Sequence, residues 1–103
     1  MDSTNLFKPD QAETAEERFD TLLALKNVTI ERILSPPGTV TELTEQPHDE
    51  WICILQGSAR LEMDSTFHHL HRGDQMLIPA NTRHRVLTTS HRPHCLWLAV
   101  HIR

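Results

Sequence analysis

Short runs of β-branched and aliphatic residues, separated by turn residues, fill the chain from Val28 onward, and this pattern constrains the fold more than any other feature. One run shows the period of a strand directly, because the apolar residues Ala59, Leu61 and Met63 alternate with polar ones. Such alternation is typical of a strand with one buried face. Since no second helical segment separates the runs, the pattern predicts an all-β antiparallel sandwich or barrel.

The limits of these runs predict where the strands lie. We expect strands at residues 28–34, 39–45, 51–56, 59–63, 67–70, 75–78, 84–89 and 95–102. The segment Ser35-Pro36-Pro37-Gly38 ends the first of them, and Gly57 and Gly73 fall at predicted turns. Residues 28–103 are therefore expected to form one β-domain.

The chain before residue 28 follows a different pattern. Residues 1–12 are largely polar, and we expect them to form an arm that docks on a neighbouring surface. Thr14-Ala15-Glu16-Glu17 matches a capping box, and the apolar residues that follow it have helical spacing: Phe19, Leu22 and Leu23. The sequence thus predicts a short amphipathic helix ending near Lys26, and an N-terminal unit of arm and helix over residues 1–27.

Composition narrows the classes of function. The 103 residues carry a net charge of −4 with Lys and Arg scattered, so nucleic acid is not expected as a partner. No apolar run approaches the ~20 residues of a membrane helix, and the first residues lack the features of a signal peptide. We therefore expect a cytoplasmic protein with no membrane partner. Cys53 and Cys95 lie in predicted strands and are expected to pack as small hydrophobic residues.

Strand parity brings polar residues together at one end of the predicted barrel. Residues two apart on a strand share a face, so Gln46, His48 and Glu50 would point the same way, with Thr44 before them. On a second strand His84 would share a face with Val86 and Thr88. The two sets predict a polar group of residues in the barrel mouth.

These two stretches resemble the paired motifs of the cupin superfamily. The first motif reads Gly38-TVTEL-Thr44-Glu45-Gln46-PHD-Glu50-WICILQ-Gly57, with the family spacing throughout. The second reads Gly73-DQMLI-Pro79-Ala80-Asn81-TR-His84-RVL-Thr88, in which Asn81 replaces a glycine. Asn adopts positive φ more readily than most residues. The resemblance implies a double-stranded β-helix, the cupin or jelly-roll barrel, and the whole chain is similar to small single-domain bacterial cupins of uncertain function.

The resemblance also implies which residues would bind a metal. Glu50 and His84 occupy two of the usual ligand positions, whereas Thr44 and Gln46 stand where the family has histidines. Thr hydroxyl and Gln amide oxygens are weak ligands for a transition metal. His48 lies about two residue rises (~7 Å) from Glu50 on a regular strand and is one replacement. His101 is another. A set of His48, Glu50 and His84, with Gln46 or His101 as a further ligand and water in an open position, would suit Fe, Mn, Ni or Zn.

Two functions fit this reading. In the first, a metal in the barrel mouth acts on a small organic substrate, with Glu50 as the alternative catalytic acid or base. The substrate pocket would be lined by Gln46, Ile52, Ile54, Met76, Ile78, Val86 and Trp97. In the second, the same pocket belongs to a metal-free binding or sensor module. A homodimer formed through sheet edges is also expected, because exposed sheet edges need cover.

Overall fold

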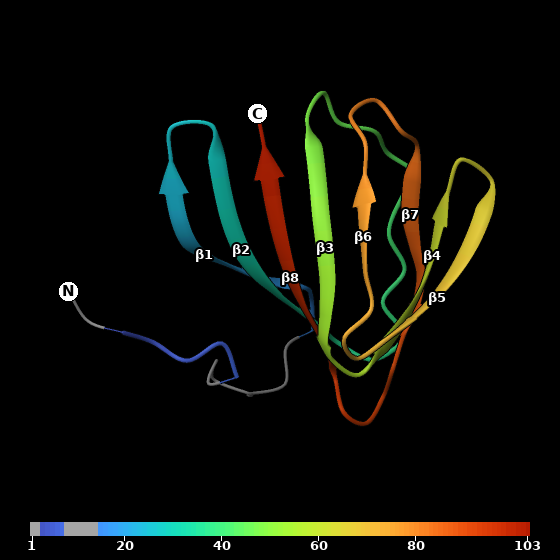
Figure 1. Ribbon diagram of the computed structural model, residues 1–103. Helices are drawn as coiled ribbons and strands as arrows, with labels where there is room; N and C mark the ends of the chain where they lie inside the picture. The colour runs from blue at the N-terminus through green and yellow to red at the C-terminus, as the bar shows by residue number, and fades with distance from the viewer. Residues whose placement is uncertain (1–2, 8–14) are drawn as a thin grey trace.

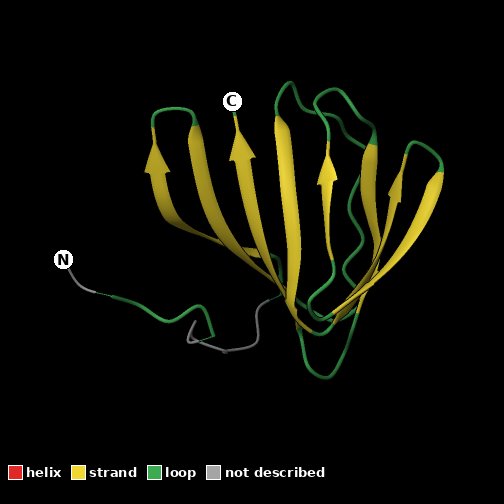
Figure 2. Ribbon diagram, viewed as in Figure 1, coloured by secondary structure: helices red, strands yellow, loops and turns green. Residues whose placement is uncertain are grey.

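The computed structural model describes residues 3–7 and 15–103, and the described residues contain strands and no helix (Figures 1 and 2). The strands are β1 (Arg18–Leu25), β2 (Val28–Ser35), β3 (Asp49–Gln56), β4 (Ser58–Met63), β5 (Thr66–His71), β6 (Gln75–Ile78), β7 (His84–Thr89) and β8 (Cys95–Ile102). They form a five-stranded sheet in the order β1-β2-β8-β3-β6 and a three-stranded sheet in the order β5-β4-β7. Each strand pairs with its neighbours antiparallel. The predicted all-β jelly-roll barrel is confirmed.

The predicted N-terminal helix is wrong within the described residues. Arg18–Leu25 is the strand β1, which pairs with β2 along its length. Leu22 is an extra residue at a bulge between Thr21 and Leu23, and this bulge lets the helical spacing of apolar residues fit a strand. Pairing with the free edge of β2 supplies hydrogen bonds that outweigh the local preference for a helix. Thr14, the first residue of the capping box, lies outside the described residues.

β1 and β2 form one hairpin, so the predicted unit boundary between residues 27 and 28 falls in the turn between them. Lys26 in this turn has a φ of 43°. Among the described residues no helix is long and apolar enough to cross a membrane.

The segment predicted as a strand at 39–45 is mostly irregular. It forms a single bridge, between Thr44 and His84, with hydrogen bonds in both directions between their backbone N and O atoms at 2.9 and 3.0 Å. The Thr41 N–H also donates to the Val86 carbonyl, and the Val86 N–H donates to Thr41 Oγ1. The segment therefore lies beside β7 without a continuous ladder, because side-chain bonds replace part of the backbone pairing.

Strand register determines which side chains point between the sheets. On the five-stranded sheet Ile33, Trp97 and Ile54 lie opposite one another across β2, β8 and β3. All three are buried in the apolar core, and Ile54 is fully buried. Cys95 is also fully buried, and burial raises its pKa to about 12, so the thiol stays protonated. Both cysteines are free, as the sequence predicts.

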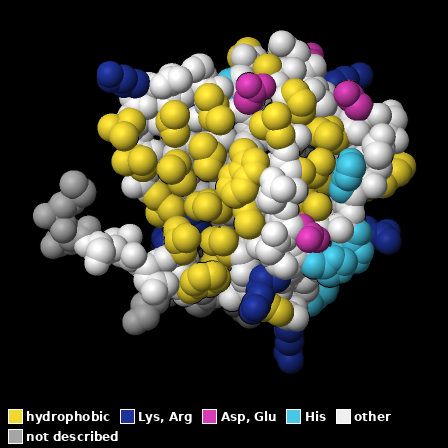
Figure 3. Space-filling view, viewed as in Figure 1, with side chains coloured by type: hydrophobic (Ala, Val, Ile, Leu, Met, Phe, Trp, Pro, Cys, Tyr) yellow, Lys and Arg dark blue, Asp and Glu magenta, His cyan; other side chains and the backbone are white. Residues whose placement is uncertain are grey.

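The opposite face of the five-stranded sheet is also apolar. One row of paired residues crosses all five strands and consists of Leu23, Ile30, Val100, Trp51 and Leu77. Figure 3 shows hydrophobic side chains gathered over β1, β2, β8 and β3. The exposed apolar side chains of this outer apolar row therefore form a continuous line across the sheet and are not scattered singly.

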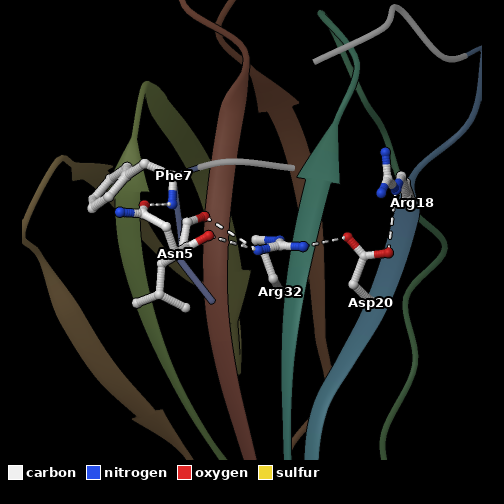
Figure 4. Close-up of polar contacts among 6 residues, drawn as sticks. Asn5, Phe7, Arg18, Asp20 and Arg32 are labelled. Atoms are coloured by element: carbon white, nitrogen blue, oxygen red, sulfur yellow. Dashed lines mark hydrogen bonds and ion pairs between the residues drawn. The ribbon is translucent and has the colours of Figure 1, made fainter. Parts of the chain in front are cut away.

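Part of this outer face is covered by the described residues of the N-terminal arm. Arg32 on β2 has a side chain only 10% exposed, and its Nη1 donates to the carbonyls of Asn5 and Leu6 at 3.4 Å each. Its Nη2 donates to Asp20 Oδ2 at 3.0 Å, and Arg18 Nε donates to Asp20 Oδ1 at 3.2 Å (Figure 4). A buried guanidinium therefore connects the arm, β2 and β1.

Candidate functional site

A cavity of about 320 Å³ lies between the two sheets. The five-stranded sheet contributes Glu31, Ile33, Glu50, Ile52, Trp97 and His101 on the inward face. The three-stranded sheet contributes Leu61, His84 and Val86, and the irregular segment beside β7 contributes Thr41, Glu42, Thr44 and Gln46. Ile78, Phe19 and Glu17 complete the lining. The cavity thus has an apolar interior and a set of carboxylates and imidazoles.

Glu50 is positioned by the register of β3. It lies opposite His101 on β8 and opposite Ile78 on β6, so its side chain points inward with theirs. Glu50 is only 9% exposed. Gln46 Nε2 donates to its Oε1 at 2.6 Å, whereas Oε2 makes no hydrogen bond to the described residues. One carboxylate oxygen is therefore held by the protein and the other is free to accept from a ligand.

His84 reaches the same cavity from the opposing sheet. It begins β7 and is half-buried, and its backbone pairs with Thr44. Nδ1 lies 2.9 Å from the carbonyl oxygen of Thr82. Because a carbonyl only accepts, Nδ1 carries the hydrogen, and Nε2 of the neutral ring keeps its lone pair. Glu50 and His84, 34 positions apart in the sequence, line one space.

His101 is held by hydrogen bonds at both ring nitrogens. Its Nε2 lies 2.8 Å from Glu31 Oε1, and its Nδ1 lies 2.9 Å from His48 Nε2. The carboxylate accepts from Nε2–H, and one of the two imidazoles donates in the contact between His101 Nδ1 and His48 Nε2. Burial, then the charges of Arg103 and His101, lower the pKa of His48 below its usual 6.5. His48 is therefore neutral at physiological pH.

Trp97 forms part of the cavity wall, and two polar residues fix its ring. Trp97 Nε1 donates to Ser35 Oγ at 3.0 Å, and Ser35 Oγ donates to Glu17 Oε2 at 2.7 Å. Ser35 is fully buried and Trp97 is 4% exposed. Because the indole N–H has its partner inside the protein, the ring stays in one orientation along the cavity.

The structure brings most of the predicted site residues together. Gln46, Ile52, Ile78, Val86 and Trp97 line the cavity with Glu50, His84 and His101. His48, Ile54 and Met76 do not: His48 contacts His101 from outside the lining, Ile54 lies deeper in the core, and Met76 packs against that core beside Ile52.

Several lining residues were not predicted from the sequence. Glu31 and Ile33 lie on β2 and line the cavity, because the pairing of β2 with β8 determines which face of β2 points inward. Glu17 and Phe19 come from the segment predicted as a helix, so strand parity does not identify them. Leu61 was identified as the buried face of a strand but not as part of the cavity.

The described residues do not form a metal-binding cluster. Among residues 3–7 and 15–103, no group of three or more His, Cys, Asp or Glu side chains is arranged to hold an ion. Both nitrogens of His101 are hydrogen-bonded, and His48 uses its Nε2 for that contact. Glu50 and His84 remain as strong metal ligands, beside the weak metal ligands Gln46 and Thr44. The side chains present therefore do not fit the metal set expected from the sequence.

The two antiparallel sheets form a jelly-roll barrel with a cavity between them. Together with Glu50 and His84 at the motif positions, this architecture defines a cupin-type protein. The family model for the cupin domain matches residues 32–101, and the chain belongs to this family. Asn81 has the positive φ, 60°, that its place in the second motif requires. No curated protein sequence matches the chain.

Solved structures from bacteria share this fold. A structure from Ralstonia eutropha JMP134, named "putative mannose-6-phosphate isomerase", is 35% identical with a TM-score of 0.90, over 99% of this chain and 98% of that one. A cupin superfamily protein from Desulfitobacterium hafniense is 21% identical with a TM-score of 0.78, over 88% and 81%. An RmlC-like cupin protein from Desulfovibrio desulfuricans is 17% identical with a TM-score of 0.81, over 99% and 96%. The last two support the fold alone.

Proposed function

We propose that this cupin binds a small organic molecule in the cavity between its sheets, with Glu50 and His84 contacting the polar part of the ligand. The observation that carries the proposal is that these two side chains, from opposing sheets, line one cavity together with the apolar side chains of Ile52, Leu61 and Val86. Cavities of about this size, with an apolar lining and a few convergent polar groups, are typical small-molecule sites.

Each of the two residues offers a defined contact. Oε2 of Glu50 accepts a hydrogen bond from a ligand hydroxyl or amine, since Oε1 is already held by Gln46. Nε2 of His84 accepts likewise, because Nδ1 donates to Thr82. Ile52, Val86 and Trp97 exclude water from the apolar part of the ligand. No step in this proposal requires a metal.

Intrinsic fluorescence tests the proposal directly. The chain has two tryptophans, so in a Trp51→Phe background only Trp97 reports. We would titrate this protein with cyclohexanol, cyclohexylamine and cyclohexanecarboxylate, which share one ring and differ in charge. We expect at least one probe to shift the Trp97 emission in a saturable way. An unchanged emission with all three probes would show that the cavity is not a ligand site.

A matched pair of variants locates the binding site. Val86→Phe places a larger side chain in the cavity, whereas Val100→Phe makes the same change on the outer apolar row. Both residues are half-buried strand positions. We expect Val86→Phe to lose binding and Val100→Phe to keep it, with circular dichroism confirming that both fold. Equal behaviour of the two variants would place the binding elsewhere. Dialysis of the protein against EDTA should leave binding unchanged.

An isomerase is the second candidate function. The observation that favours it is the 35% identity with the Ralstonia eutropha protein, together with a carboxylate and an imidazole lining one cavity. An isomerisation by proton transfer needs a base and an acid on the same substrate, and His84 Nε2 and Glu50 are the candidate groups. The activity in that neighbour's name is tested by measuring the isomerisation of mannose 6-phosphate with wild type, Glu50→Gln and His84→Gln. Turnover lost in both variants would support it, and no turnover by wild type would remove it.

A further inference from the structure

The geometry points to a small organic cation as the ligand class of this cavity, and to exclusion of phosphorylated and other anionic molecules. This inference rests on the proposed function, since it names the chemistry of the molecule that the same cavity would bind.

The charged residues that line the cavity all have one sign. Its carboxylates are Glu17, Glu31, Glu42 and Glu50, and the lining contains no Lys or Arg. The two lining imidazoles are His84, whose Nδ1 donates to the Thr82 carbonyl, and His101. A ligand that enters the cavity therefore meets a negative field, which attracts cations and repels anions.

The hydrogen bonds of these carboxylates leave most of that charge uncompensated. Glu17 accepts from the Ser35 hydroxyl and Glu50 accepts from the Gln46 amide, and both donors are neutral. Glu31 contacts His101, a side chain that can carry positive charge. Glu42 is exposed on the irregular segment and has no hydrogen-bond partner among the described residues.

The basic side chain of Arg103, at the end of the strand that carries His101, has its own partner. Arg103 follows His101 by two residues, and its Nη1 donates to Thr29 Oγ1 at 3.1 Å. It lies outside the lining of the cavity. The charge of Arg103 lowers the pKa of His48, which also lies outside that lining. Arg103 donates no hydrogen bond into the cavity. A phosphate group in the cavity would thus find carboxylates where it needs guanidinium or ammonium donors.

The wall supplies a second contact that favours cations. The Trp97 ring lines the cavity in a fixed orientation, and the negative face of an indole attracts ammonium groups. Ile33, Ile52 and Val86 would pack against the apolar part of the same ligand. An aromatic ring, several carboxylates and an apolar surface together suit an alkyl or cycloalkyl amine better than a sugar phosphate.

The probes that share one ring test this inference through charge. We expect cyclohexylamine, which is protonated at neutral pH, to bind the Trp51→Phe protein about tenfold more tightly than cyclohexanol, and cyclohexanecarboxylate not to bind. In the same assay, mannose 6-phosphate should bind more weakly than mannose. Binding of the neutral or anionic probe as tight as that of the amine would overturn this inference and leave the proposed function standing. No binding by any probe would overturn the proposed function itself.

Two glutamates three positions apart on the irregular segment provide a matched control. Glu42 lines the cavity, whereas Glu45 is exposed on the same segment and does not. We expect Glu42→Gln to weaken cyclohexylamine binding about threefold and to leave cyclohexanol unchanged, because it removes one of four charges near solvent. Glu45→Gln should change neither. Equal losses in both variants would attribute the attraction to general surface charge and would overturn the inference.

Discussion

The hydroxyl of Ser35 fixes the orientation of the Trp97 ring. It accepts from Trp97 Nε1 and donates to Glu17 Oε2, and it is fully buried. Ser35→Ala leaves a buried indole N–H without a partner, so we expect a loss of about 1–3 kcal/mol in the free energy of unfolding. Urea denaturation measures this, with the exposed Ser3→Ala as the control. A loss no larger than that of the control would show that the contact does not hold the ring.

Asp20 makes the stability of the fold depend on pH in the acid range. Burial raises its pKa, but the hydrogen bonds from Arg32 and Arg18 lower it more, so the pKa of the folded protein lies below the usual 3.8. A carboxylate with a lowered pKa stabilises the fold above its unfolded value, and that contribution disappears as pH falls through the folded value. Asp20→Asn should therefore cost about 1–3 kcal/mol at pH 7, because Arg32 stays buried without its carboxylate.

The pH profile distinguishes this contact from a general surface effect. The stability difference between wild type and Asp20→Asn should be constant above about pH 5 and should shrink as pH falls below 3.8. Thermal denaturation across this range provides the measurement. A difference that stays constant down to pH 2 would contradict the assigned ion pair.

At this scale the sequence predicts some site residues well. Glu50 and His84 follow from motif spacing and strand parity, which are local properties. Glu31 and Glu17 do not, since their places in the cavity depend on which strands become neighbours. The proposed metal role of His101 depends on its partners, and the hydrogen bonds to Glu31 and His48 come from residues far away in the sequence.

Among the elements, β1 shows where local pattern and tertiary pairing diverge. Apolar residues at positions 19, 22 and 23 fit a helix, and the same residues fit a strand once a bulge is inserted. No local signal marks the bulge, whereas the free edge of β2 decides the outcome. The predicted bounds of β6, β7 and β8 agree with the structure, and those of β3, β4 and β5 differ by one or two residues, because the turns carry glycine, proline or polar residues.

Gly57 connects the two sheets at the turn from β3 to β4, and its side-chain position is occupied. A Cβ there would lie 2.5 Å from Ser90 Oγ and 2.8 Å from the His94 carbonyl oxygen, and φ is +75°. Gly73 has a similar positive φ and nothing within 4 Å of a Cβ. We expect Gly73→Ala to cost about 1–2 kcal/mol from backbone strain, and Gly57→Ala to cost about 1–3 kcal/mol more from overpacking. Equal midpoints in urea denaturation would contradict this account of the turn.

For the whole molecule, the outer apolar row predicts a homodimer. Leu23 is 42% exposed and Leu77 is 48% exposed at the two ends of a row that is apolar across all five strands. A second copy presents the same row, so a two-fold interface buries both at once. We expect sedimentation equilibrium to give twice the chain mass of 11.9 kDa.

A pair of variants tests this interface. Changing Leu23→Lys together with Leu77→Lys should give a monomer that keeps its circular dichroism spectrum, because the added charges cannot be buried against a second copy. Phe67→Lys places a lysine on the three-stranded sheet, where Phe67 is 69% exposed, and should remain a dimer. A monomeric wild type, or a dimer that survives the first change, would contradict the prediction.

The central claim is that the cavity between the sheets binds a small organic cation. A crystal structure of the protein in complex with cyclohexylamine tests it most directly, because the structure shows where the ligand lies. We predict the amine between Glu50 Oε2 and the Trp97 ring, with the cyclohexane against Ile52 and Val86 and with His84 facing the same space. A structure in which Glu50 and His84 point into separate regions, or in which the amine binds outside the cavity, would contradict it.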